Sequence, residues 1–233
     1  MRNSIVQLTI AMSFGNNEAV MHPTLLCDEH NIILVDCGFI GSLPLLENEL
    51  RKHGLAASQL TGLVLTHHDH DHMGAAAALK RLNPKMKIYS SSAEAPYISA
   101  LEKPLRLRQA EEMQNALPPA QQEFGRLFCD MLRRVEPVPV DCILEDGQYL
   151  DWCGGCRVIA TPGHTPGHIS LLMEDDSVII AGDAIALENG VPVIANPQFT
   201  LDMEQAARSM DKLLLYRAAS YYCCHGGVYS TQM

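Results

Sequence analysis

The chain has 233 residues, of which 47% are hydrophobic, and this length suits one large domain or two small ones. We expect a single domain over residues 1–233. The formal net charge of −10 argues against nucleic acid as a partner, because binding its backbone depends on Lys and Arg that neutralise phosphates. A membrane is not expected as a partner either, because no run approaches the ~18 apolar residues of a membrane-spanning helix.

The opening residues and the cysteines indicate a cytoplasmic protein. Residues 1–15 lack the clean apolar stretch of a signal peptide and have the pattern of a strand. Eight cysteines without an export signal favour reduced thiols over a disulfide framework. The oligomeric state stays open, with a dimer as one option.

Strand-like and helix-like patterns alternate in the first third of the chain. Apolar runs predict further strands at residues 19–28, 31–38, 60–67 and 87–91. Helical spacing predicts two helices, at residues 42–54 with Ser42 as the N-cap and at residues 73–84. This alternation is typical of a layered α/β fold.

The rest of the chain contains a helical segment and then returns to short strands. Residues 93–135 have helical periodicity that breaks at Pro118 and Pro119, which predicts an insert of two helices. Later strands are expected at 138–144, 156–160, 168–174, 177–182 and 219–224, with a helix at 202–216. Two strand-rich halves with helices predict a four-layer αββα sandwich that carries the insert.

Residues 67–72, "HHDHDH", place four histidines and two aspartates directly after an apolar run. In one register, His67 and Asp69 lie two positions apart at the end of a strand, so both side chains point the same way and can reach one ion. Asp71 and His72 then begin a helix, where the chain turns and can direct them at a second ion.

A second register is available in the same six residues. His68, His70 and His72 alternate along one face of an extended strand. A solvated loop rich in imidazoles, with no ligand role, is the third interpretation. At this point the residues alone leave all three open.

Three later stretches complete a pattern that begins with THHDHDH at residues 66–72: TPGHTPGH at 161–168, AGD at 181–183 and CCHGG at 223–227. In this order they resemble the metallo-β-lactamase superfamily, whose signature begins Thr-His-x-His-x-Asp-His and continues with a lone His, a bridging Asp and a final His. The stretch at 161–168 looks most like glyoxalase II and its relatives. The resemblance implies the αββα sandwich and a metal-dependent hydrolase.

By position, the resemblance implies a dinuclear centre with one ion on His67, Asp69 and His164, a second on Asp71, His72 and His225, and Asp183 bridging the two. Such a centre cleaves its substrate with a bridging hydroxide, while Asp71 is the residue that could orient the hydroxide or move its proton. Zinc is the first choice, because imidazoles dominate the ligand set, and iron or manganese are the alternatives.

Asp69 departs from the family's pattern, which has its second histidine there. Two divalent ions carry four positive charges, and the three carboxylates with one hydroxide carry four negative ones, so the centre is formally neutral. With a histidine the count would be one positive charge. The hard carboxylate oxygen also moves metal preference toward iron or manganese.

Other candidates have roles outside the ligand set. Asp36 looks like the family's buried aspartate at a strand end, which supports the ligand loop by hydrogen bonds. His168 begins an apolar strand, and we expect it to support the centre instead of binding an ion. Cys153 and Cys156 form a C-x-x-C, for which a turn with two free thiols is favoured over a zinc or redox pair.

Three functions are compatible with these patterns. The first is a dinuclear hydrolase of a small-molecule ester, lactone, thioester or phosphodiester. The second is an iron-dependent redox enzyme of the same fold, and the third is a noncatalytic binding member. Substrate choice is expected to depend on the insert, whose apolar face consists of Leu101, Leu105, Leu107, Met113 and Leu117.

Overall fold

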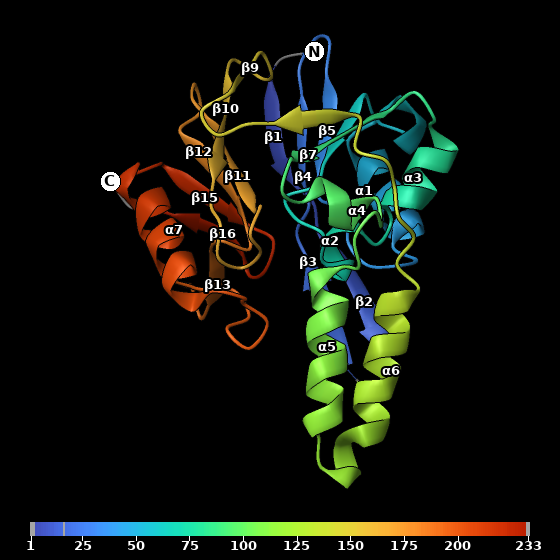
Figure 1. Cartoon of the computed structure of the whole chain (residues 1–233). Coiled ribbons are helices and arrows are strands. Elements are labelled where there is room, and N and C mark those ends of the chain that lie inside the picture. The colour runs from blue at the N-terminus through green and yellow to red at the C-terminus, as the bar shows by residue number, and fades with distance from the viewer. Residues whose placement is uncertain (1–2, 16, 232–233) are drawn as a thin grey trace.

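A computed structural model describes residues 3–15 and 17–231, and its centre is a pair of six-stranded sheets that face each other (Figure 1). The first sheet has the order β1-β4-β5-β6-β7-β8. It is antiparallel from β1 to β5 and parallel from β5 to β8. Its strands are β1 Ser4–Gln7, β4 Thr24–Cys27, β5 Ile32–Val35, β6 Gly62–Val64, β7 Lys87–Ser91 and β8 Cys142–Leu144.

The second sheet has the order β16-β15-β12-β11-β10-β9. Its neighbouring strands are antiparallel except for β12 and β15, which are parallel. Its strands are β9 Tyr149–Leu150, β10 Cys156–Ala160, β11 Ile169–Met173, β12 Val178–Gly182, β15 Ser220–Cys223 and β16 Gly227–Ser230.

Apolar side chains on both faces of each sheet create three layers of core. In β5, Ile33 and Val35 face the second sheet, whereas Leu34 faces the helices on the outer side. That outer layer contains α1 (Leu43–Lys52) and α3 (Ala76–Leu82). On the other side, α7 (Met203–Leu215) packs Leu213 against Ile179 of β12. The expected four-layer αββα sandwich is confirmed.

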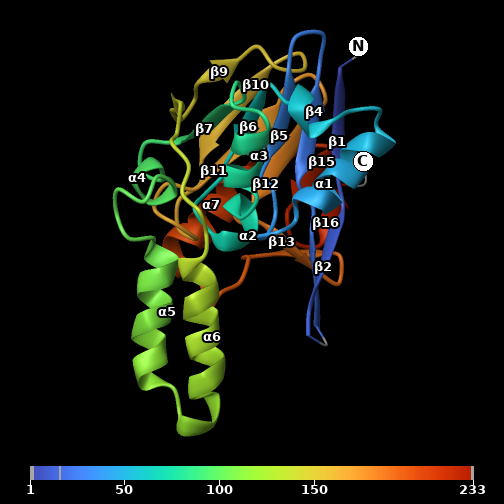
Figure 2. The ribbon, with the colours of Figure 1, turned by 90° about the vertical axis from the view of Figure 1, so that its right-hand side faces the viewer.

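The helical insert extends beyond the sandwich as a hairpin of two helices (Figures 1 and 2). After the short α4 (Ala95–Ile98), the insert contains α5 (Leu105–Ala116), the 3-10 turn η2 (Pro119–Gln121) and α6 (Gln122–Arg133). The expected break at the two prolines is therefore observed. The division of the chain into one domain remains a prediction.

Several short elements were not predicted. The strands expected at 1–15 and 19–28 are each divided, which gives the hairpin β2 (Ile10–Phe14) and β3 (Asn17–Met21). The helix expected at 73–84 is divided into α2 (His70–Met73) and α3. The hairpin β13 (Ala186–Glu188) with β14 (Val191–Val193), and the strands β9 and β16, were missed because they have only two to four residues each.

Ser42 occupies the predicted N-cap position of α1, but its side chain makes no capping bond. Its hydroxyl donates instead to the carbonyl oxygens of Cys37 and Phe39. The side chain is fully buried. Ser42 therefore fixes the turn after β5 instead of the helix terminus.

Candidate metal centre

The ligand-type side chains meet at an edge that both sheets share. Strands β5 and β6 are parallel neighbours, so Asp36 and the loop 66–72 leave the first sheet at the same edge. Strands β12 and β15 are parallel neighbours in the second sheet, so Asp183 and His225 follow strands that end together. Strand β11 is antiparallel to both β10 and β12, which places the turn 161–168 at this edge too.

Two groups of three side chains bring their ligand atoms within 4.8 Å of one another: His67, Asp69 and His164, and Asp71, His72 and His225. Asp183 lies between the groups. Its Oδ1 is 3.2 Å from His72 Nε2 and 3.4 Å from His225 Nε2, and its Oδ2 is 3.5 Å from His164 Nε2. One carboxylate therefore faces both groups.

Hydrogen bonds on Nδ1 fix which nitrogen of each ring faces the centre. His72 Nδ1 lies 2.8 Å from Asp36 Oδ2, which leaves its Nε2 as the lone-pair atom. The Thr66 hydroxyl also donates to Asp36 Oδ2 at 2.8 Å, so its oxygen accepts the Nδ1–H of His67 at 2.9 Å. The buried Asp36 thus orients one histidine directly and another through Thr66.

Several buried atoms of the centre have no hydrogen-bond partner within the described residues: Nε2 of His67, His72 and His225, and Oδ1 of Asp183. Such atoms are costly in a protein interior, and here they point toward one another. Burial also holds the pKa of His67 well below its usual value, so the ring is in the neutral form that binds metals. Imidazole nitrogens with carboxylate oxygens suit divalent zinc, so these residues fit two such ions.

The second register, with His68 and His70, does not converge on the centre. His68 Nδ1 donates to the buried carboxylate of Glu94 at 2.5 Å, and His68 Nε2 accepts the N–H of Leu105 at 3.2 Å. Both ring nitrogens are therefore occupied. His70 faces the other way, with its ring 5.9 Å from that of Phe128. The geometry favours the register of His67 and Asp69.

Asp69 has a partner that the sequence analysis did not identify. The guanidinium of Arg106, in the first turn of α5, donates Nε to Asp69 Oδ1 at 3.1 Å and Nη2 to Oδ2 at 2.6 Å. Burial raises the pKa of Asp69, but the charge of Arg106 and hydrogen bonds with His164 and His67 outweigh it and hold the pKa well below the usual value. Asp69 is therefore ionised.

His168 contacts the backbone of Asp183 and lies outside the two groups of ligand atoms. Its Nε2 accepts the backbone N–H of Asp183 at 2.9 Å, and its Nδ1 lies 2.8 Å from the Thr161 hydroxyl. Gly182 makes room for this ring, because a Cβ at that position would lie 2.6 Å from His168 Nε2. The strand end is thus shaped to present the Asp183 carboxylate.

The comparison with known proteins assigns this architecture to a family. The family model described as the metallo-beta-lactamase superfamily matches residues 22–225. The chain belongs to this superfamily. Within it, the chain is 33% identical over 215 residues to the probable metallo-hydrolase YflN of Bacillus subtilis, a match that covers 85% of this chain and 76% of YflN.

Two other proteins resemble the chain. A hydroxyacylglutathione hydrolase of Aeromonas hydrophila is 27% identical over 205 residues, which cover 84% of this chain and 60% of that enzyme. The crystal structure of a metallo-beta-lactamase family protein from Thermus thermophilus superposes with a TM-score of 0.74 at 25% identity, covering 97% of this chain and 74% of that one. The prediction of a metallo-hydrolase enzyme of this superfamily is confirmed.

Within the described residues, no helix combines the length and the apolar character needed to cross a membrane. The cysteines of the C-x-x-C are free and buried, and desolvation raises the pKa of Cys153 to about 11 and that of Cys156 to about 12. Both thiols are therefore protonated, which agrees with the expected turn with two free thiols.

The sequence analysis missed Arg106 and Glu94, which both lie in the insert region. Glu94 is fully buried and accepts the backbone N–H groups of His68 and Gly167 at 3.0 and 2.8 Å. It therefore ties the ligand loop 66–72 to the turn that carries His164. A charged residue without a motif gave no signal that it would be buried here.

Asp36→Asn should weaken metal binding without removing a ligand. The amide retains one acceptor oxygen, whereas Asp36 accepts three hydrogen bonds from Thr66 and His72, so the His72 ring loses its fixed orientation. We expect zinc affinity to fall by about 10- to 100-fold, measured by competition with a chromogenic chelator. Asp28→Asn is the control, because Asp28 accepts bonds from a turn at residues 30–31. Equal affinity in both variants would contradict the role of Asp36.

Glu94→Gln should reduce the acid sensitivity of the fold. Burial raises the pKa of Glu94. His68 and the N–H of Gly167 lower it by more than burial raises it, so the pKa lies below the ordinary 4.5. A pKa lowered by folding gives stability that is present above the unfolded pKa and is lost as the pH falls through the folded one. The wild type should therefore lose free energy of unfolding more steeply than Glu94→Gln between about pH 5 and 3, as measured by urea titration. The exposed Glu29→Gln should follow the wild type.

Proposed function

We propose that the chain is a dinuclear metal-dependent hydrolase that cleaves a carboxylic ester, lactone or thioester with an apolar acyl group. The observation that carries this proposal is the position of Asp183 between two complete groups of ligand atoms. Zinc remains the first choice of metal, because four of the seven ligand-type side chains are histidines.

Two bound divalent ions would supply a hydroxide nucleophile near neutral pH and would polarise the carbonyl oxygen of the substrate. The residues of the chain hold and orient the reacting groups. Asp71 is less buried than the other carboxylates and lies with Oδ2 at 3.5 Å from His225 Nε2. It is therefore the candidate to accept a proton from the nucleophile and to pass it to the leaving group.

An apolar groove of about 530 Å³ reaches His70 of the loop 66–72 and favours an acyl substrate. It lies between the hairpin β2–β3 and helix α6, and its larger lining side chains are Phe39, His70, Phe124, Leu127, Phe128 and Met131. Among the described residues, no lysine or arginine lines it, which disfavours a phosphodiester. His70 connects the two sites, because its Nδ1 is 3.5 Å from Asp71 Oδ1.

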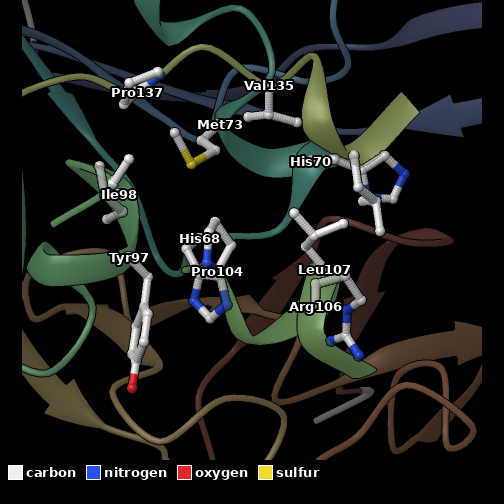
Figure 3. A pocket seen from close by; sticks show the side chains of 12 residues that line it. His68, His70, Met73, Tyr97, Ile98, Pro104, Arg106, Leu107, Val135 and Pro137 are labelled. Atoms are coloured by element: carbon white, nitrogen blue, oxygen red, sulfur yellow. The ribbon is translucent and has the colours of Figure 1, made fainter. Parts of the chain in front are cut away.

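The apolar residues expected to determine substrate choice do not line this groove. Leu101 is 84% exposed and Met113 is 42% exposed, and neither lines the groove. Helix α6 supplies the groove instead, through Phe124, Leu127 and Phe128. A second cavity, at the start of α5, holds about 30 Å³ and has room for little more than water, so we assign no substrate to it (Figure 3).

The dinuclear proposal predicts close to two ions per chain after separate reconstitution with zinc, iron and manganese, measured by elemental analysis. Asp183→Ala removes the carboxylate that both groups share. We expect it to retain at most one ion and to lower kcat/KM for an activated ester by at least about 100-fold. The exposed Asp176→Ala should match the wild type. A stable wild-type protein with one ion or none would contradict the proposal, and iron with redox activity would favour the alternative enzyme.

The apolar groove predicts that the enzyme prefers esters with longer acyl chains. Phe128→Ala removes an aromatic wall, and the loss of one such contact is worth roughly tenfold in binding. KM for an octanoyl ester should therefore rise about tenfold while kcat for that ester changes little. For an acetyl ester, both KM and kcat should change little. Leu101→Ala, on the same insert but away from the groove, is the matched control. An equal effect of Phe128→Ala on both esters would exclude the groove as the acyl site.

A further inference from the structure

Arg106 is a buried cation that the insert carries into the metal centre. Its side chain is 3% exposed, and its guanidinium contacts both oxygens of Asp69. Nη2 also lies 3.3 Å from His164 Nε2. We infer that Arg106 is the positioning residue for Asp69, and that the hydrogen-bonded pair of the Asp69 carboxylate and the Arg106 guanidinium takes the place of the histidine of the family's pattern. This inference rests on the proposed function, since it concerns the same centre.

The guanidinium is held from outside the centre as well. Nη1 donates to the side chain of Gln109 and to the carbonyl oxygen of Phe199, and the carbon Cζ lies 5.2 Å from the centroid of the Phe199 ring. With Nε and Nη2 on Asp69, all three nitrogens have partners. A buried arginine with this many fixed contacts is preorganised, so Asp69 receives its hydrogen bonds in one geometry.

The contacts also fix the orientation of the Asp69 carboxylate. Oδ2 lies 3.1 Å from His164 Nε2 and 3.6 Å from His67 Nε2, so it is the oxygen that faces the other ligand atoms. Oδ2 also accepts Nη2 of Arg106 at 2.6 Å and Nε at 3.0 Å, whereas Oδ1 accepts Nε at 3.1 Å. Arg106 therefore fixes the carboxylate with one oxygen, Oδ2, toward the other ligand atoms, as the ring of a histidine would present one nitrogen.

Charge gives the second reason for treating the two residues as one unit. The formal count for the centre without Arg106 is zero, and the guanidinium raises it to one positive charge. That equals the count for a centre with histidine at position 69 and no arginine beside it. A histidine at position 69 would leave Arg106 buried beside an ion without its carboxylate, which is strongly unfavourable.

A double-mutant cycle tests the unit. It compares the wild type, Asp69→His, Arg106→Gln and the double variant, in the 233-residue chain loaded with zinc. The readouts are the rate of zinc transfer to a chromogenic chelator and the melting temperature with and without zinc. Arg108→Gln is the matched control, because Arg108 is an exposed arginine of the same helix.

We expect Asp69→His alone to lose zinc at least about tenfold faster than the wild type, because the guanidinium is left unpaired beside the ion. Arg106→Gln alone should lower the melting temperature of the zinc-free protein, because the buried carboxylate loses its cation. The double variant should transfer zinc within about threefold of the wild-type rate, since the net charge and the single donor atom are restored. Arg108→Gln should match the wild type.

Two results would overturn the inference. One is an Asp69→His variant that holds zinc as well as the wild type, and the other is a double variant no better than Asp69→His. If Arg106→Gln does not fold, Arg106→Lys keeps the charge without the planar fork and should fall between the wild type and Asp69→His. A wild type that binds no zinc, iron or manganese would contradict the proposed function instead, and melting temperatures without metal would still report whether Asp69 and Arg106 are coupled.

Discussion

Buried negative charge is the constraint on which the centre depends. Asp36, Asp69 and Asp183 are all buried at the edge where the two sheets end, and a carboxylate removed from water must be paired or bound to a cation. The charge of each carboxylate is compensated in a different way. Asp36 accepts hydrogen bonds from Thr66 and His72, Asp69 is paired with Arg106, and Asp183 faces histidines whose Nε2 atoms lack partners in the described chain. The centre thus leaves a place for positive charge between its two halves.

The insert connects this charge balance to substrate choice. Helix α5 supplies Arg106 to the centre, and helix α6 supplies the wall of the groove. The N–H of Leu105, at the start of α5, donates a hydrogen bond to His68. His68 in turn is hydrogen-bonded to Glu94, which also accepts the N–H of Gly167 in the turn 161–168. A movement of the hairpin would therefore alter both the carboxylate at 69 and the groove. In the proposed enzyme, binding and metal geometry depend on the same pair of helices.

The sequence predicted the layered fold and the convergence of the ligand-type residues, because both depend on local patterns. Apolar strands such as residues 31–38 end in polar residues, and the parts of the family's motif lie next to the ends of such strands. Arg106 and Glu94 could not be found this way. Arg106 reaches Asp69 across 37 positions of the chain, on a helix whose other charged residues are exposed or half-buried, and spacing alone does not reveal which one turns inward. The charge count of the ligand set did not include Arg106 for the same reason.

The pairing of Asp69 with Arg106 also changes the metal preference that can be inferred from Asp69. A free carboxylate is a hard, strongly donating ligand and is the reason to consider iron or manganese. The three hydrogen bonds from Nε and Nη2 of Arg106 draw electron density from both oxygens of Asp69, which weakens its donation to an ion. A carboxylate held in this way donates less charge to an ion than an unpaired one does. In the proposed enzyme, the departure at position 69 is therefore a weaker argument for iron, and the four histidines are the stronger guide, toward zinc.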